Sequence, residues 1–289
     1  MSEPVTISSG DLTARIDPLG AELLSLTDRD GRELMTNADP AFWGGHAPLL
    51  FPIIGRLNGD VLRLDGREYP MKQHGFARRL PWEVVGAGAD GVTFRLRDSA
   101  ETRAVYPFEF ELAVLYSLDE ATLSIVVRVS NPGDVPLPMS FGFHPAFAWP
   151  LPYGQPREDH RIVFDTDEPG PIATLTDGLI VGEKPSPLAG RTLAVTDELF
   201  ADDALIWSPV ASQSVRYGAA NGPQLLIEFP DTPHLGIWTK PGAQFVCIEP
   251  WHGHADPAGF TGDFRDKPGI IAVAPGEEWR CRMDVTLEG

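Results

Sequence analysis

Cysteine is scarce in this sequence of 289 residues, which contains only Cys247 and Cys281. Two cysteines are too few for a disulfide framework, and Cys281 belongs to an alternating apolar stripe that is typical of a buried thiol. Long hydrophobic runs are absent as well, and the first residues lack the basic and apolar segments of a secretion signal. We therefore expect a cytoplasmic protein with no membrane partner.

Positive charge is also in short supply. Lysine and arginine total 23, against 41 aspartate and glutamate residues, which gives a formal net charge of −18. A surface this anionic repels nucleic acids and acidic lipids, so no nucleic-acid partner is expected. The global charge does not exclude one small anionic ligand, because a local group of arginines can override the wider field.

The sequence lacks the motifs of several enzyme classes. No G-x-S-x-G turn marks a serine hydrolase, and no phosphate-binding glycine loop precedes a helix, so a nucleotide cofactor is not expected. Helical periodicity is nearly absent. The best short candidate covers residues 196–200, where Thr196 could cap a single helical turn.

What the sequence does contain is a regular alternation of apolar and polar residues, the pattern of half-buried strands. It is clearest at residues 92–97 and 279–287, while residues 112–116 and 245–248 are continuously apolar, as in strands covered on both faces. Asn-Gly and Asp-Gly turns separate such runs, and 28 prolines and 29 glycines are spread along the chain. The pattern predicts an all-β fold, a large antiparallel β-sandwich formed by residues 1–289 as one domain.

Four short clusters place a charged or titratable side chain among aromatic residues, prolines and glycines, and they contain Arg56, His74, His144 and Glu249. Glu249 ends an apolar run and precedes Pro250, so burial would raise its pKa toward that of a useful base. His144 lies among aromatic residues, where burial favours the neutral imidazole. Arg56 could instead be a surface arginine at a strand end, and either histidine could be a hydrogen-bonded structural residue.

In this order, the four clusters resemble the motifs of the aldose 1-epimerase, or galactose mutarotase-like, superfamily, and its shorter bacterial branch in particular. The matching motifs extend over nearly the whole chain: Gly55-Arg56, Gln73-His74-Gly75-Phe76-Ala77-Arg78, His144-Pro145-Ala146-Phe147 and Glu249-Pro250-Trp251. The resemblance implies a β-supersandwich with a sugar cleft on one concave face. It also implies an isomerase that interconverts the α and β anomers of an aldose and requires neither a metal nor an organic cofactor.

The resemblance further implies roles for individual residues. Glu249 corresponds to the general base that removes the proton from the anomeric hydroxyl. His144 corresponds to the acid that protonates the ring oxygen, and His74 to a second histidine that polarises this oxygen and holds the sugar. Arg56 corresponds to an arginine that binds a sugar hydroxyl.

Further substrate contacts are expected from an aspartate and from aromatic side chains. The family uses an aspartate to bind a sugar hydroxyl, and both Asp202 and Asp203 are candidates. Asp203 is preferred because it directly precedes a predicted strand. Trp251, Phe147 and Phe76 could stack on the apolar face of a sugar ring, and core packing explains each of them equally well.

Two other functions stay open at this point. The same fold could serve a non-catalytic sugar-binding or sensing protein, which needs the cleft but not the pair of glutamate and histidine. A metal-dependent sugar isomerase could use His252 and His254, which share one face of an extended chain, together with His74 or His144.

The sequence does not identify the small-molecule sugar. A phosphorylated sugar would need basic residues near the cleft, and Lys72, Arg78 and Arg79 are candidates that could equally face solvent. The oligomeric state is also open, because no coiled-coil seam or distinct apolar patch is visible in the sequence.

Overall fold

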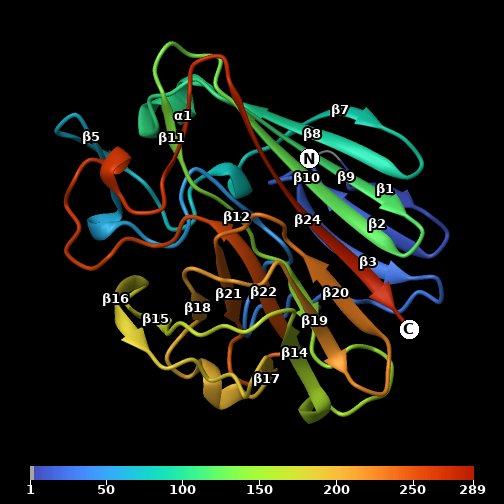
Figure 1. The fold of residues 1–289 in the computed structure, drawn as a ribbon. Helices are drawn as coiled ribbons and strands as arrows, with labels where there is room; N and C mark the ends of the chain where they lie inside the picture. The colour runs from blue at the N-terminus through green and yellow to red at the C-terminus, as the bar shows by residue number, and fades with distance from the viewer. Residues whose placement is uncertain (1–2) are drawn as a thin grey trace.

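The computed structural model describes residues 3–289 and is built almost entirely of antiparallel strands. Two large sheets and three small ones make up the fold (Figure 1). The predicted all-β, antiparallel class is therefore confirmed. Within residues 3–289 the α-helical content is a single short helix, α1 (Ala100–Val105).

The larger sheet contains nine strands. Their bounds are β7 (Glu83–Ala87), β8 (Gly91–Arg97), β9 (Glu111–Asp119), β10 (Thr122–Ser130), β14 (His160–Phe164), β17 (Thr192–Ala194), β19 (Ser214–Ala219), β20 (Gln224–Glu228) and β24 (Glu278–Glu288). They are ordered β17-β14-β19-β20-β24-β10-β9-β8-β7, which brings the last strand of the chain into the middle of the sheet (Figure 1).

The second large sheet contains eight strands and carries most of the candidate site. Their bounds are β4 (Leu49–Leu50), β12 (Phe141–Phe143), β13 (Ala146–Ala148), β15 (Ile172–Thr176), β16 (Leu179–Lys184), β18 (Leu205–Trp207), β21 (His234–Trp238) and β22 (Phe245–His252). The order is β16-β15-β18-β21-β22-β12-β4, and β13 also pairs with β22.

The remaining elements are short. A three-stranded sheet contains β1 (Val5–Ser8), β2 (Leu12–Asp17) and β3 (Glu22–Asp28), and it lies beside β8 and β9 (Figure 1). Two pairs of strands form the other small sheets: the hairpin of β5 (Val61–Leu64) and β6 (Arg67–Pro70), and β11 (Leu137–Met139) with β23 (Ile271–Val273), which are distant in the sequence. Five 3-10 turns cover Asn58–Asp60, Ala77–Arg79, Arg157–Asp159, Asp197–Phe200 and Phe264–Asp266.

The core lies between the two large sheets and is filled by alternate side chains of their strands. Tyr217 of β19 packs against Phe147 of β13, with ring centroids 6.5 Å apart. Phe164 of β14 packs against Trp207 of β18, with centroids 5.0 Å apart. Burial of each large apolar side chain stabilises the fold by about 1.5–3 kcal/mol, so these contacts fix which face of each strand turns inward.

Most strand predictions are confirmed, and the helix prediction is not. Residues 92–97 and 279–287 lie in β8 and β24, and the apolar run 245–248 opens β22, which is buried at all but its last residue. The candidate turn becomes the 3-10 turn Asp197–Phe200, but Thr196 makes no capping hydrogen bond. The true helix, α1, was not predicted, although Ser99 caps it through the backbone N–H of Thr102.

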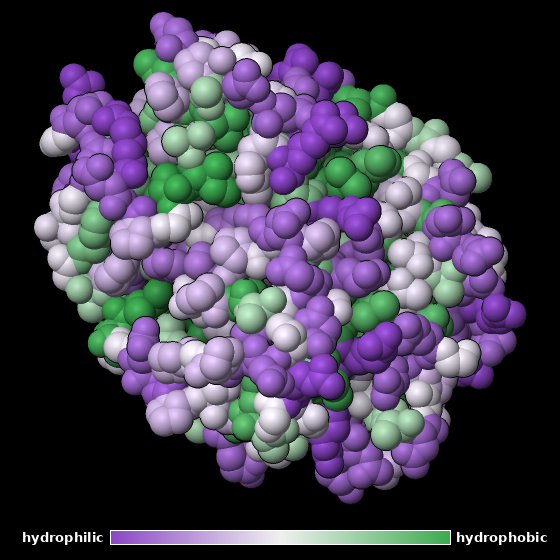
Figure 2. All heavy atoms as spheres, in the orientation of Figure 1, coloured by the Kyte–Doolittle hydropathy of each residue, from purple (hydrophilic) through white to green (hydrophobic). Residues whose placement is uncertain are grey.

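The face of the molecule in Figure 2 is mainly hydrophilic, with apolar side chains gathered in separate small patches. This agrees with the strongly acidic composition of the chain. Among residues 3–289, no helix has the length and apolar character needed to cross a membrane.

Candidate active site

Glu249 and His144 come from neighbouring segments of one sheet and lie opposite each other. β12 pairs with the end of β22 and β13 with its beginning, in one continuous register. That register sets His144, in the connection between β12 and β13, across from Glu249. Pro145 and Pro250 have no N–H to donate, so the ladder of hydrogen bonds is interrupted here. Because opposed residues on antiparallel strands project to the same face, both side chains meet there.

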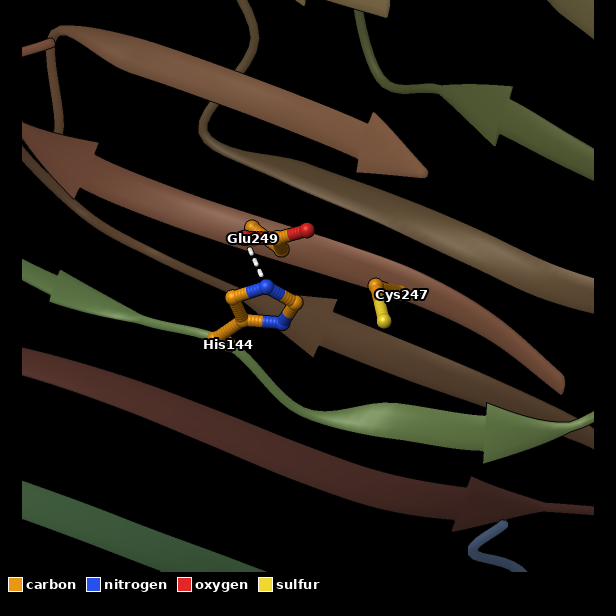
Figure 3. A group of neighbouring side chains, drawn as sticks. All are labelled: His144, Cys247 and Glu249. Atoms are coloured by element: carbon orange, nitrogen blue, oxygen red, sulfur yellow. Dashed lines mark ion pairs between the residues drawn. The ribbon is translucent and has the colours of Figure 1, made fainter. Parts of the chain in front are cut away.

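The two side chains form a buried pair. His144 Nε2 lies 3.4 Å from Glu249 Oε2 (Figure 3), and the exposed fractions of the residues are 7% and 1%. Burial raises the pKa of Glu249 well above its usual value; the Trp251 indole opposes this and the Asp203 charge adds to it. Burial, and next the charge of Arg78, lower the pKa of His144 to about 3. Both groups therefore favour their neutral forms.

His74 is presented to the same site as a neutral hydrogen-bond donor. Its Nδ1 accepts a hydrogen bond of 3.1 Å from the backbone N–H of Gly55, so in the neutral ring the proton is on Nε2. Burial and the nearby charge of His144 lower the pKa of His74 well below its usual value. The His74 ring centroid lies 5.6 Å from that of His144. His74 has φ of 64°, a left-handed conformation that is uncommon outside glycine and is concentrated at functional sites.

These three residues line a cleft of about 280 Å³. This volume is near the lower end of the range of about 300–1,000 Å³ that small-molecule sites occupy. Trp43, Trp238 and Trp251 form aromatic walls, and polar side chains interrupt them. Within the cleft, Glu249 Oε2 and His144 Nδ1 are buried without a hydrogen-bond partner. Buried polar atoms are normally satisfied, so this arrangement is suited to a ligand that carries both apolar faces and hydroxyl groups.

Two of the tryptophans are held in fixed positions. Trp43 stacks on His144, with ring centroids 4.9 Å apart and an angle of 20° between the planes. Trp251 lies over two glycines: a Cβ on Gly142 would be 2.6 Å from its ring, and one on Gly236 would be 2.5 Å from it. Such distances are too short for any side chain, so the ring can lie flat against the strands only because these positions are glycine.

Two charged residues also line the cleft. Asp203 lies in its wall, has φ of 84°, and accepts a hydrogen bond of 2.8 Å from the backbone N–H of Ala204. Asp202 does not line the cleft, so Asp203 is the better placed of the two candidates. Arg78, in the 3-10 turn that follows His74, lines the same cleft.

Three of the predicted contacts, Arg56, Phe147 and Phe76, do not line the cleft. The guanidinium of Arg56 donates to both carboxylate oxygens of Asp60, at 2.7 and 2.8 Å, and lines a neighbouring hollow instead. In this conformation Arg56 does not line the cleft, because Asp60 and the Asp177 carbonyl oxygen engage its guanidinium. Phe147 is 1% exposed and packs on Tyr217, since the alternation of β13 turns it into the core. Phe76 likewise packs on core aromatic rings.

The histidines proposed as metal ligands, His252 and His254, do not line the cleft that His74 and His144 line. His252 lies 3.4 Å from the Thr232 hydroxyl and packs on Trp279, whereas His254 contacts the Ala255 carbonyl oxygen at 2.7 Å.

Within residues 3–289 the one group with metal-ligand spacing is His144, Cys247 and Glu249, whose ligand atoms all lie within 4.8 Å of one another (Figure 3). All three are buried, and burial raises the pKa of the Cys247 thiol well above its usual value. Burial thus favours the protonated thiol, and a metal bound here would have to displace its proton.

Trp43 and Trp238 are the site residues that the sequence analysis missed. Trp43 comes from the connection between β3 and β4, far from any of the four motifs. A local signal was present, because the Gly44-Gly45 pair after it leaves room for the ring: a Cβ on Gly45 would be 2.5 Å from Trp43. Trp238 ends β21, whose pairing with β22 could be inferred only once the sheet order was known.

Comparisons with known proteins identify the family of the chain. The sequence model of the family described as Aldose 1-epimerase matches residues 3–286. The chain is 31% identical over 288 residues to the plasmid-encoded protein LacX of Lactococcus lactis subsp. lactis, with 96% of each chain covered. It resembles the X-ray structure of a galactose mutarotase related enzyme from Lactobacillus acidophilus, with 34% identity, a TM-score of 0.92 and coverage of 99% and 97%. A galactose mutarotase-like protein from Lactobacillus casei has 31% identity, a TM-score of 0.91 and coverage of 99% and 100%. The chain therefore belongs to the aldose 1-epimerase family.

Proposed function

We propose that this protein is an active aldose 1-epimerase, an isomerase that interconverts the α and β anomers of a sugar with a free anomeric hydroxyl. The observation that carries the proposal is the buried pair of Glu249 and His144, 3.4 Å apart in a cleft of suitable size. Opening a pyranose ring requires a base at the anomeric hydroxyl and an acid at the ring oxygen at the same time. If Glu249 and His144 hold one proton between them, the unprotonated member is the base and the protonated member is the acid.

In the reactive tautomer the shared proton is on His144, so Glu249 is a carboxylate. Glu249 accepts the proton of the anomeric hydroxyl while His144 donates its proton to the ring oxygen, and the bond between C1 and the ring oxygen breaks to give the open-chain aldehyde. Rotation about the C1–C2 bond presents the other face of the carbonyl group. Ring closure then runs the two proton transfers in reverse and restores the pair.

The other residues of the cleft assist this exchange. His74 donates from Nε2 and polarises the ring oxygen without changing its own protonation state. The face of Trp43 against His144 stabilises the imidazolium form by a cation–π contact, worth about 0.5–2 kcal/mol. Asp203 is suited to bind a sugar hydroxyl, and Trp251 to contact the apolar face of the ring.

The pH dependence of kcat/KM follows from the count of protons on the pair. Because the pKa of Glu249 is raised, the pair loses its proton only as the pH rises past that raised value, and the acid for the ring oxygen is then missing. Because the pKa of His144 is lowered to about 3, a second proton is not taken up above about pH 5. We expect kcat/KM to be level on the acid side and to fall on the alkaline side. A rate that rises steadily with pH through neutrality would contradict the one-proton pair.

Removal of metal ions is expected to leave the activity unchanged. Glu249 and His144 need free lone pairs for proton transfer, and a metal held by them with Cys247 would block both. The measurement is the mutarotation rate before and after dialysis against a chelator, with elemental analysis of protein purified without a metal-affinity tag. A loss of activity that added Zn²⁺ restores would contradict the mechanism.

The proposal is tested by polarimetry on freshly dissolved single anomers of hexoses, pentoses and sugar phosphates. We expect the protein to accelerate equilibration of at least one of them in proportion to its concentration, above the spontaneous rate in the same buffer. If no sugar in the panel equilibrates faster, the chain is a sugar-binding protein at most, and the enzyme proposal fails.

A further inference from the structure

Cys247 is a buried cysteine beside the reacting pair that the mechanism above does not use. It lies two residues before Glu249 on β22, and its partner on β13 is Ala146, two residues after His144. Because residues two apart on a strand project to the same face, the thiol and the carboxyl group lie side by side. The three side chains thus offer a ring nitrogen, a sulfur and a carboxylate oxygen within 4.8 Å of one another (Figure 3).

The spacing of these three atoms is close to that of a tetrahedral metal centre. Bonds of about 2.0–2.3 Å to nitrogen, oxygen and sulfur place the ligand atoms of a tetrahedral zinc ion about 3.5 Å apart. His144 Nε2 and Glu249 Oε2 are already 3.4 Å apart, so the adjustment that is needed falls on the side chain of Cys247. Within residues 3–289, Oε2 is also buried without a hydrogen-bond partner, which leaves its lone pairs free for a ligand.

The surroundings of Cys247 favour a complex that carries no net charge. Apolar side chains enclose the thiol, namely Ala146, Ala243, Phe245, Phe42, Trp43 and Trp238. Burial of an uncompensated charge among such residues is costly. A divalent cation bound to a thiolate, a carboxylate and a neutral imidazole has no net charge, once the thiol proton and any proton on the carboxyl group have left to solvent.

We propose that His144, Cys247 and Glu249 form a binding site for divalent cations of intermediate softness, such as Zn²⁺, Co²⁺ and Cd²⁺, and that an ion bound there stops the reaction. Thiolate and imidazole ligands favour these ions over Mg²⁺ and Ca²⁺, which prefer oxygen. Glu249 and His144 line the cleft and Cys247 does not, so the ion enters from the cleft. It then occupies the atoms that would accept and donate protons to the sugar.

The second shell of the site indicates reversible binding rather than a permanently held ion. A histidine that binds a metal almost always donates its other ring N–H to an oxygen atom, and loss of such a partner lowers metal affinity about 10- to 100-fold. Nδ1 of His144 has no hydrogen-bond partner among the residues that the structure describes. The charge of Arg78, which acts on His144, also opposes a cation. The ion is therefore an inhibitor that binds when it is present in excess and leaves when it is removed.

Binding is measured first, without any sugar. Protein dialysed against a chelator is titrated with Zn²⁺ by calorimetry, and we expect one ion per chain, while Mg²⁺ at the same concentration gives no binding heat. Cys247→Ala removes a direct ligand, so it should weaken Zn²⁺ binding by more than the about 10- to 100-fold that loss of a ligand's hydrogen-bond partner causes. Cys281→Ala is the matched control, because Cys281 is also a buried thiol but lies on β24 of the other sheet, and its affinity for Zn²⁺ should be unchanged.

Spectra identify the ligands in the unchanged protein. A bond between Co²⁺ and a thiolate gives a charge-transfer band in the near ultraviolet, which should appear in the unchanged protein and in Cys281→Ala and be missing from Cys247→Ala. X-ray absorption of the zinc form should show one sulfur at about 2.3 Å, together with nitrogen and oxygen ligands at about 2.0–2.2 Å. Melting temperatures verify that the variants are folded.

Inhibition is measured by polarimetry, and only this part of the inference rests on the proposed function. We expect Zn²⁺ to reduce the mutarotation rate in proportion to the fraction of protein that has bound it, and a chelator to restore the rate. Each variant is compared with its own metal-free rate. Cys247→Ala should need a Zn²⁺ concentration raised by the same factor as its binding constant, and Cys281→Ala the same concentration as the unchanged protein.

The metal site is overturned if Zn²⁺ does not bind stoichiometrically, if Cys247→Ala binds it as tightly as the unchanged protein, or if the spectra show no sulfur ligand. An unchanged rate at saturating Zn²⁺ would overturn the inhibition. The proposed function fails separately: a protein that binds Zn²⁺ through sulfur but accelerates no sugar keeps the metal site and is not an epimerase. Turnover with no bound ion would leave the epimerase standing and remove the metal site.

Discussion

Replacing Glu249 with glutamine is expected to lower kcat for anomer interconversion by about 10²–10⁴-fold, the range that one positioned acid–base group contributes. Glutamine has the same shape, so the pair and the cleft should keep their geometry. It cannot accept the anomeric proton as a carboxylate does, and it leaves His144 without the partner with which it shares a proton. The rate is measured by polarimetry on purified protein, with the spontaneous rate subtracted.

Glu228→Gln provides a control for this substitution. It also removes one carboxylate from a strand, but Glu228 lies on β20 of the other sheet and outside the cleft. We expect its activity to equal that of the unchanged protein. Glu249→Gln activity within tenfold of the unchanged protein would show that another group is the base, and the proposed mechanism would then have to be abandoned.

His144→Gln is expected to reduce kcat by a similar factor of about 10²–10⁴, because the ring oxygen then lacks its proton donor. The rate of the double variant tests the mechanism more strictly than the rate of either single variant. Since Glu249 and His144 share one proton and act as a unit, combining Glu249→Gln with His144→Gln should lower the rate little further than either change alone.

The cycle of four proteins is measured under one set of conditions. If the two effects multiply instead, the residues act independently, and the account of a one-proton pair is incorrect even if each residue proves necessary. His144→Gln also removes the ring on which Trp43 stacks, so melting temperatures are compared to ensure that lost activity reflects chemistry rather than unfolding.

The strands could be predicted from sequence wherever one face is buried. Residues 92–97 and 279–287 alternate strictly, and they form β8 and β24 because only one phase of a strand places all its apolar side chains in the core. The helix α1 could not be found in this way. It has six residues, too few to show a helical period, and only the Ser99 cap marks its start.

Site residues that belong to a sequence motif could be predicted. Side-chain contacts that depend on how distant segments pack could not. The motifs pointed to Glu249, His144 and His74, and the fold brings all three to one cleft. Arg56 lies outside the cleft in this conformation, since its ion pair with Asp60, four residues on, depends on the local turn and is not evident from the motif. Phe147 is directed into the core, and its direction could not be predicted because it depends on the register of β13 with β22.

The measurement that tests the central claim most directly is magnetisation transfer by NMR between the two anomeric protons of a sugar at equilibrium in D₂O. The account predicts an exchange rate that increases linearly with protein concentration, while the anomeric proton signals keep their intensity, because ring opening breaks the bond between C1 and the ring oxygen and leaves the C1–H bond intact. It predicts this for at least one aldose. Exchange that stays at the spontaneous rate for every such sugar, or that replaces the anomeric proton with deuterium, would contradict it.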